Sequence, residues 1–151
     1  MKRDDKDKTV RDLQDAFAAS ATFYLVDFKQ MPVGQTIELR RLLRKNNFTY
    51  KVVKNRLALR ALGERCPAVL KPFFRRPTGI AWADHNPLGL AKLLREFSAG
   101  GKVLAIKAGV LNLDDVIALV RSKPRQVHIV LTGRDAPREL IDLADTVTEM
   151  R

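Results

Sequence analysis

The stretch TYKVVKNRLALR, residues 49–60, carries four cations and no acid. Its first half alternates like a strand, and its second half places leucine and alanine at helical spacing, so a strand, a turn and a helix are predicted. Asn55 follows the turn and is the expected N-cap of the helix. Cationic side chains beside a helix N-terminus suit phosphate groups, so this corner predicts a polyanionic partner. Its cations are Lys51, Lys54, Arg56 and Arg60.

The acid-free region is longer than this corner. Residues 39–63 contain eight Lys or Arg residues and no Asp or Glu. Long basic side chains also cover the solvated surfaces of many proteins, but such surfaces normally mix both signs of charge. Contact with RNA or DNA is therefore the preferred interpretation, and a solvated basic surface is the alternative. The other cations of the region, Arg40, Arg41, Arg44 and Lys45, fall on one side of a predicted helix.

The charge of the whole chain supports the same class of partner. Its 151 residues contain 28 Lys and Arg against 17 Asp and Glu, a net charge of +11. Residues 1–112 hold a net +12 and residues 113–151 a net −1, so the basic function is assigned to the first three quarters. The single cysteine, Cys66, favours a reducing compartment. Because no signal core and no membrane-spanning apolar run occur, a cytoplasmic location is expected.

No catalytic or cofactor-binding pattern accompanies these cations. The sequence AGGK at 99–102 lacks the spacing of a phosphate-binding loop and precedes a predicted strand, whereas such a loop follows one. His85 and His128 stand apart without a nucleophile signature, and structural roles are preferred for both. Asp84 beside His85 has the types of a base and its orienting residue, but a polar loop at a strand end is preferred. The chain is therefore expected to be no enzyme and to hold no cofactor or metal.

The elements that must position the basic residues alternate along the chain. Interleaved helices and strands predict an α/β (α+β) fold, a layered sandwich with a central sheet flanked by helices. The predicted helices cover 6–19, 36–45, the stretch between Asn55 and Gly63, a short piece in CPAVLKPFF, and the stretch from Asn86 to Gly100; the predicted strands cover 21–28, 48–53, 79–83 and 102–111.

The end of the chain forms a separate predicted segment. Its pattern gives a helix over 113–122, a strand over 127–131 and a helix over 137–144. This helix-strand-helix segment is too short to bury a core of its own, so it is expected to pack on the rest or to remain partly loose.

Several motifs in order resemble a known family. FYLVDFKQMPVGQTIELRRLLRKNNFTYKVVKNRLALRAL, RRPTGIAWADHNPLGLAKLLREF and KVLAIKAGVLN are similar to the bacterial large-subunit ribosomal stalk-base protein, number ten of that subunit, over about residues 6–112. The resemblance implies an N-terminal α/β domain that binds the stalk base of large-subunit rRNA beside ribosomal protein eleven. It also implies a long C-terminal helix that collects dimers of the acidic stalk protein.

The same resemblance implies which residues contact RNA. The strand–turn–helix matches the family's basic corner, and the first residues match its basic N-terminal segment. Phosphate contacts and recognition of a folded RNA's shape are expected, with little reading of bases. Arg75 and Arg76 stand where the family usually has a small residue, so no function is carried over to them. The implied RNA-binding residues are Lys2, Arg3, Lys6, Lys8, Lys29, Lys51, Lys54, Asn55, Arg56 and Arg60.

The last 39 residues depart from this family. VHIVLTGRDAP and LADTVTEM resemble the C-terminal strand and helix of the ATP:corrinoid adenosyltransferases. The phosphate-binding loop that such enzymes need is missing, so no transferase activity is inferred. The long C-terminal helix is also missing, so acidic stalk dimers are not expected as partners. A chimera of two family fragments explains both departures, and a divergent natural tail is the alternative.

The preferred function is thus an rRNA-binding structural protein that anchors the stalk base of the large ribosomal subunit. Residues 1–112 are expected to form the RNA-binding domain and residues 113–151 a C-terminal segment. The first alternative is a chimeric or designed chain with no evolved ligand, in which the basic residues are a relic. A protein related to nucleotide or corrinoid binding ranks third.

Overall fold

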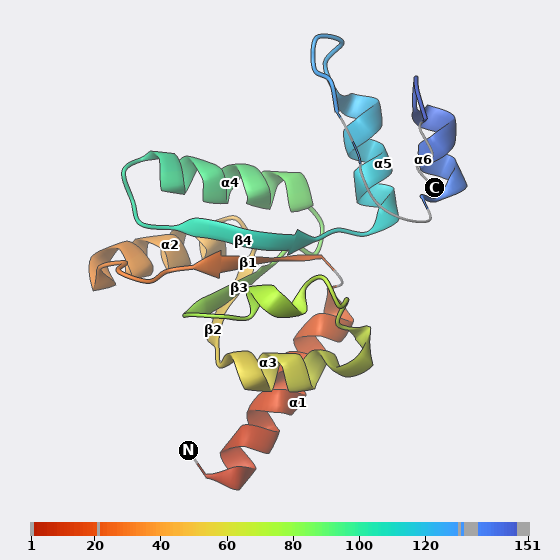
Figure 1. Ribbon diagram of the computed structural model, residues 1–151. Helices are drawn as coiled ribbons and strands as arrows, with labels where there is room; N and C mark the ends of the chain where they lie inside the picture. Colours follow the sequence, from red (N-terminus) through yellow and green to blue (C-terminus); the bar gives the residue numbers. More distant parts are fainter. Residues whose placement is uncertain (1, 21, 130, 132–135, 148–151) are drawn as a thin grey trace. The chain divides into compact units, whose positions relative to one another are not determined.

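The computed structural model describes residues 2–20, 22–129, 131 and 136–147. The chain divides into two units, one ending at Leu111 and one beginning at Asn112, and each is described by itself. The first unit is built on a four-stranded antiparallel sheet with the strand order β2-β3-β1-β4 (Figure 1). The strands are β1 (Phe23–Asp27), β2 (Thr49–Val53), β3 (Thr78–Trp82) and β4 (Ala105–Val110).

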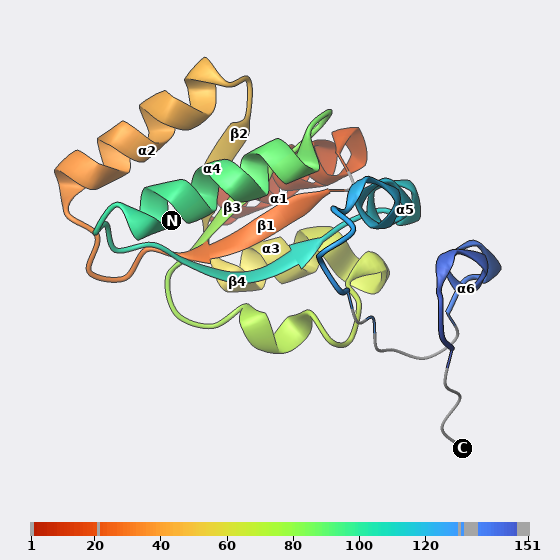
Figure 2. The same ribbon diagram turned by 90° about the horizontal axis from the view of Figure 1, so that it is seen from above.

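Helices cover both faces of this sheet. α1 (Arg3–Ala19) and α3 (Asn55–Leu62) lie against one face, and α2 (Val33–Lys45) and α4 (Pro87–Ala99) lie against the other, as Figure 2 shows from above. Two short 3₁₀ turns, η1 (Gly63–Arg65) and η2 (Lys71–Phe73), lead from α3 toward β3. The three layers confirm the predicted sandwich of a central sheet flanked by helices.

The pleat of the sheet separates two apolar cores. Alternate residues of a strand point to opposite faces, so Leu25 packs with α1 and α3 while Val26 packs with α2 and α4. Phe17 of α1 ties its helix to the sheet, because its ring lies 5.0 Å from that of Phe23 and 5.4 Å from that of Trp82. The cation-bearing helices α1, α2 and α3 therefore each bury an apolar side in one of the two cores.

Two helices begin earlier than the spacing of apolar residues predicts. α1 starts at Arg3 instead of residue 6, since the carboxylate of Asp5 accepts a hydrogen bond from the backbone N–H of Lys2 (3.3 Å) and acids favour a helix N-terminus. α2 starts at Val33 instead of residue 36, directly after Pro32, whose restricted φ suits a helix entry. The short helix predicted in CPAVLKPFF is wrong except for η2, because its prolines interrupt a regular helix.

The second unit contains α5 (Leu113–Ser122) and α6 (Arg138–Leu143), which contact each other. α5 confirms the helix predicted over 113–122, and its N-cap Asn112 accepts a hydrogen bond from the N–H of Asp115 (2.8 Å). The strand predicted over 127–131 is wrong for the described residues 127–129 and 131, and residue 130 lies outside the described residues. A strand needs a neighbour for its backbone groups, and the described residues of this unit provide none. None of the described helices has the length and apolar character needed to span a membrane.

Candidate nucleic-acid interface

The predicted strand–turn–helix is present and its cations are exposed. We call Lys51, Lys54, Asn55, Arg56 and Arg60 the basic corner. Lys51 leaves β2 on the face that α1 and α3 cover, and Lys54 lies between β2 and α3. Arg56 and Arg60 are exposed on α3. Because β2 is an edge strand of the sheet, the corner lies at the border of the first unit.

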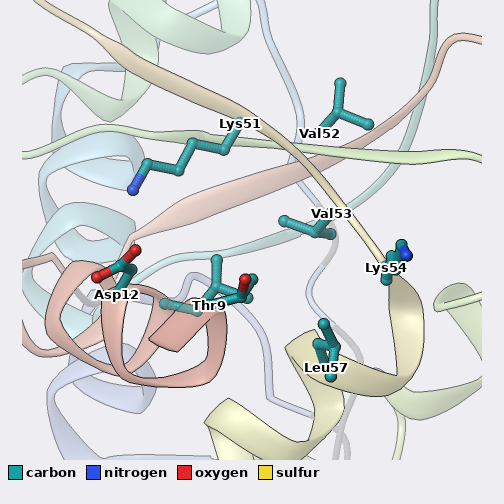
Figure 3. Close-up of a pocket in the computed structure, with 8 residues that line it drawn as sticks. Thr9, Asp12, Lys51, Val52, Val53, Lys54 and Leu57 are labelled. Carbon is teal, nitrogen blue, oxygen red and sulfur yellow. The ribbon is translucent and has the colours of Figure 1, made fainter. Parts of the chain in front are cut away.

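A shallow hollow of about 250 Å³ joins the basic corner to α1. Figure 3 shows Lys51 extending from β2 toward the side where Asp12 of α1 lies, while Lys54 stands at the other end of the hollow. The hollow thus carries both signs of charge. Its lining residues are Thr9, Asp12, Leu13, Lys51, Val52, Val53, Lys54 and Leu57.

Asn55 is not the N-cap of α3, so this prediction is wrong. Lys54 takes the N-cap position with an extended backbone, and Asn55 is the first helical residue. The Asn55 side-chain Nδ2 donates a hydrogen bond to the carbonyl oxygen of Arg76 (2.9 Å). Its Oδ1 is buried and has no hydrogen-bond partner among the described residues. The amide therefore serves a tertiary contact with the loop before β3, which local sequence rules for caps cannot reveal.

Arg60 connects the basic corner to the N-terminal helix. Its guanidinium lies 3.2 Å from the carboxylate of Asp7 in α1, and the two side chains are 64% and 39% exposed. Ion pairs this exposed contribute little to stability. The pair nevertheless partly neutralises Arg60, so this residue offers less charge to a ligand than the sequence suggests.

The other N-terminal cations lie on a helix that also carries acids. Lys2 is the N-cap of α1, and the cations that follow it are exposed. Asp4, Asp5 and Asp7 interrupt them, so the surface of α1 mixes signs of charge, unlike the basic corner. α1 packs against α3 (Figure 1), so the structure brings this segment beside the corner. The predicted RNA-binding cations of α1 and its N-cap are Lys2, Arg3, Lys6 and Lys8.

Lys29 lies in the turn after β1, where its N–H donates to the Asp27 carboxylate (2.8 Å). Both β1 and β2 pair antiparallel with β3, and Val26 and Val52 are both opposite Gly79. β1 and β2 therefore run in the same direction, and their carboxyl termini lie at the same end of the sheet, about 10 Å apart across β3. The Lys29 turn and the turn at Lys54 thus leave the sheet together.

Lys107 has a role in the structure that none of the sequence-based predictions included. This lysine of β4 donates hydrogen bonds to the carbonyl of Arg75, to Oγ1 of Thr78 (2.9 Å) and to the carbonyl of Phe73 (3.5 Å). Burial lowers its pKa from the usual 10.5, while the charge of Asp27 raises it and that of Arg76 lowers it. The available signal was a lysine in the middle of the otherwise apolar stretch VLAIKAGVL, residues 103–111.

The two histidines considered for catalysis belong to different units, His85 to the first and His128 to the second. His85 is exposed and stacks on Phe48, with ring centroids 6.1 Å apart, which supports a structural role. His128 is exposed and lies outside any strand. In the second unit it lines a hollow of about 530 Å³ whose walls are mainly apolar residues of α5, α6 and the segments beside α6. The described residues contain no cluster of His, Cys, Asp or Glu able to hold a metal ion.

Comparison with known proteins identifies two similarities. A family model described as ribosomal protein L10 matches residues 1–99, and one described as ATP:corrinoid adenosyltransferase BtuR/CobO/CobP matches residues 101–151. The second match begins before β4, although β4 pairs with β1 inside the first unit. The border between the two family matches therefore differs from the border between the structural units.

Whole-chain relatives favour the first family. The large ribosomal subunit protein uL10 of Geobacter sp. is 36% identical over 145 residues, which cover 91% of this chain and 84% of the relative. Those of Carboxydothermus hydrogenoformans and Bacillus cereus are 35% and 32% identical, covering 87% and 92% of this chain and 79% and 88% of the relatives. At 91% coverage the similarity extends past residue 112, into the second unit. The chain therefore belongs to the uL10 family of large-subunit ribosomal proteins.

Proposed function

We propose that this chain binds rRNA at the stalk base of the large ribosomal subunit, with residues 1–112 as the RNA-binding domain. A ribosomal protein of the large subunit takes part in translation in the cytoplasm, and its main macromolecular partner there is polyanionic RNA. The observation that carries the proposal is the basic corner at an edge of the sheet, inside 25 residues without an acid. Its exposed Lys51, Lys54 and Arg56 come from a strand, a turn and a helix.

The proposed contacts are mainly to phosphates. Lysine supplies a mobile point charge, whereas the planar guanidinium of arginine donates two parallel hydrogen bonds to one phosphate. The fold fixes the backbone positions of these cations on a strand, a turn and a helix, so they favour an RNA whose folded backbone places phosphates within reach of all three. Lys29, at the same end of the sheet, and the exposed cations of α1 extend the surface to either side.

The test is fluorescence anisotropy of a labelled stalk-base rRNA fragment, beside a base-paired RNA of equal length, at several salt concentrations. Tight binding that prefers the stalk-base fragment, with a salt slope of several phosphate contacts, is expected. Lys51→Ala/Arg56→Ala should weaken it. The matched control is Lys92→Ala/Arg95→Ala, which also removes one lysine and one arginine, but from α4 on the other face of the sheet. Equal binding of both RNAs would reject the proposal.

One partner prediction follows from the resemblance to the stalk-base family, and a second follows from the departure of residues 113–151 from it. Ribosomal protein eleven is the proposed neighbour at the stalk base. Acidic stalk dimers are not expected to bind this 151-residue chain stably. Mixing the chain with purified stalk dimers and separating the mixture by size tests the second prediction, and stable co-elution would reject it.

A nucleotide-related function is the second candidate, because the adenosyltransferase family model matches residues 101–151. The hollow of the second unit is lined by few polar side chains, among them Lys123, His128 and Asp145. Calorimetric titration with ATP and Mg²⁺ decides between the candidates. Absence of binding heat would leave the second unit without this function, and saturable heat would establish it. If the chain neither prefers the stalk-base RNA nor binds ATP, the favoured interpretation becomes a chimeric or designed chain without an evolved ligand.

A further inference from the structure

The loop before β3 presents two adjacent arginines, Arg75 and Arg76, beside the basic corner. Both are exposed. The backbone of Arg76 has a φ of +60°, in the left-handed region that residues other than glycine adopt rarely. Such a conformation persists only where neighbouring contacts hold it. The fold therefore fixes the course of this loop.

The carbonyl groups of both arginines are held from two sides. Asn55 of α3 donates to the carbonyl of Arg76 (2.9 Å), and so does the buried hydroxyl of Thr78 (3.1 Å). Lys107 of β4 donates to the carbonyl of Arg75 and to Oγ1 of Thr78. The carbonyls of the loop accept hydrogen bonds from side chains of α3, β3 and β4, which hold its backbone at the end of the sheet. The side chains of Arg75 and Arg76 remain exposed.

The register of the sheet places this loop next to the corner. Val53 pairs with Thr78, so Lys54 and Arg76 lie just beyond neighbouring strand ends. The turn that contains Lys29 follows β1 at the same end of the sheet. Burial lowers the pKa of Lys107, the charge of Asp27 raises it, and the smaller effect of Arg76 lowers it, so Arg76 lies near enough to act on the lysine that supports its loop. The exposed cations at this end of the sheet, Lys29, Lys54, Arg75 and Arg76, outnumber the carboxylate of Asp27.

We propose that Arg75 and Arg76 form a second phosphate-binding element, continuous with the basic corner, and that Asn55 and Lys107 are positioning residues that act through the carbonyls of this loop. The inference rests on the proposed RNA-binding function. It extends that function to two arginines which the resemblance to the family leaves without a role. It also changes the role of Asn55 from a direct RNA contact to a support for the loop.

The first experiment is the anisotropy titration with full-length Arg75→Ala/Arg76→Ala. Loss of two charge-assisted hydrogen bonds should weaken binding of the stalk-base fragment by about tenfold or more. The salt slope should fall by roughly the contribution of two phosphates. Lys92→Ala/Arg95→Ala removes two charges elsewhere on the same unit and should change binding by much less. Thermal unfolding by circular dichroism checks that each variant is folded.

The outcomes separate this inference from the proposed function. If Lys51→Ala/Arg56→Ala weakens binding while Arg75→Ala/Arg76→Ala behaves like the α4 control, the inference is overturned and the proposed function stands. If the unchanged protein shows no preference for the stalk-base RNA, the proposed function fails and the inference fails with it.

A double-mutant cycle tests the positioning role. Asn55→Ala should weaken RNA binding in the unchanged chain but add little to Arg75→Ala/Arg76→Ala, because the loop through which it acts has then lost its ligand-binding side chains. A direct contact from Asn55 to RNA, or a general loss of structure, would give the same loss in both backgrounds and would overturn this role. Lys107→Met provides the same comparison from the β4 side of the loop.

Discussion

Tyr50 combines a buried hydroxyl with a close approach to backbone. Its ring lies over Gly79 of β3, where an added Cβ would come within 2.7 Å of two ring carbons. The hydroxyl is buried and has no hydrogen-bond partner among the described residues. Burial raises the pKa of Tyr50 above the usual 10.0, and the charge of Arg40 acts in the opposite direction. The residue therefore packs well as an aromatic ring and poorly as a phenol.

Tyr50→Phe should leave the free energy of unfolding at pH 7 unchanged or raise it by about 1 kcal/mol, because a buried unsatisfied hydroxyl is removed. The raised pKa means that the folded state keeps the phenol proton longer than the unfolded state. Stability from this group is complete below pH 10 and is lost as the pH rises through the folded pKa. The variant should therefore lose less stability than the unchanged protein in urea titrations above pH 10.

Tyr24→Phe is the control for this prediction. The Tyr24 hydroxyl donates to the carbonyl of Pro87 (3.0 Å), so its removal should lower stability at pH 7 by about 1 kcal/mol. Equal losses in the two variants would contradict the assignment of Tyr50 as unsatisfied.

Gly79→Ala should destabilise the first unit by roughly 1–3 kcal/mol, because the new methyl group overlaps the Tyr50 ring and the surrounding side chains must shift. Urea unfolding at pH 7 measures the loss. Combining the change with Tyr50→Leu should cost less than the sum of the two single losses, since the ring is then absent. Additive losses would show that the close approach is not the cause.

At the scale of elements, the packing of α1 on α3 brings an acid against the basic corner. Asp7→Asn removes the carboxylate beside Arg60 and frees its guanidinium. Because the pair is exposed, the free energy of unfolding should fall by no more than about 1 kcal/mol. Binding of the stalk-base RNA should become tighter and more sensitive to salt. Weaker RNA binding by a folded Asp7→Asn protein would contradict the view that Asp7 competes with the RNA for Arg60.

Local patterns predicted the elements that depend on local rules. α4 begins after Asn86, whose side chain accepts from the N–H of Gly89 (2.9 Å), and α5 has its predicted bounds. Predictions failed where a distant partner decides: Asn55 binds the Arg76 carbonyl instead of capping its own helix. The loop network around Lys107 also joins residues that lie 29 to 34 positions apart, which no periodicity reveals. The elements that carry the basic residues were thus predictable, whereas the long-range hydrogen bonds of Asn55 and Lys107 were not.

At the scale of the whole molecule, the buried residues are unequally distributed. Among the described residues, the last buried residue of the core under α1 and α3 is Trp82 and that of the core under α2 and α4 is Leu104, and the second unit contributes no buried side chain. The positive charge follows the same division, with +12 in residues 1–112. We therefore expect the first unit to carry most of the stability and the proposed RNA binding, even though the similarity to uL10 proteins extends beyond it.

A chain shortened to residues 1–111 should therefore fold cooperatively, because it keeps β4, the edge strand that pairs with β1, and every described residue of both cores. Its urea midpoint should match the main transition of the full chain, and its affinity for the stalk-base RNA should stay within about threefold, as the removed unit has a net charge near zero. A second shortened chain, residues 1–99, ends where the ribosomal family match ends and lacks β4 and Lys107. It should unfold at lower urea and bind RNA more weakly. Equal urea midpoints and equal RNA affinities of the two shortened chains would mean that β4 and Lys107 support neither the sheet nor the proposed RNA contacts.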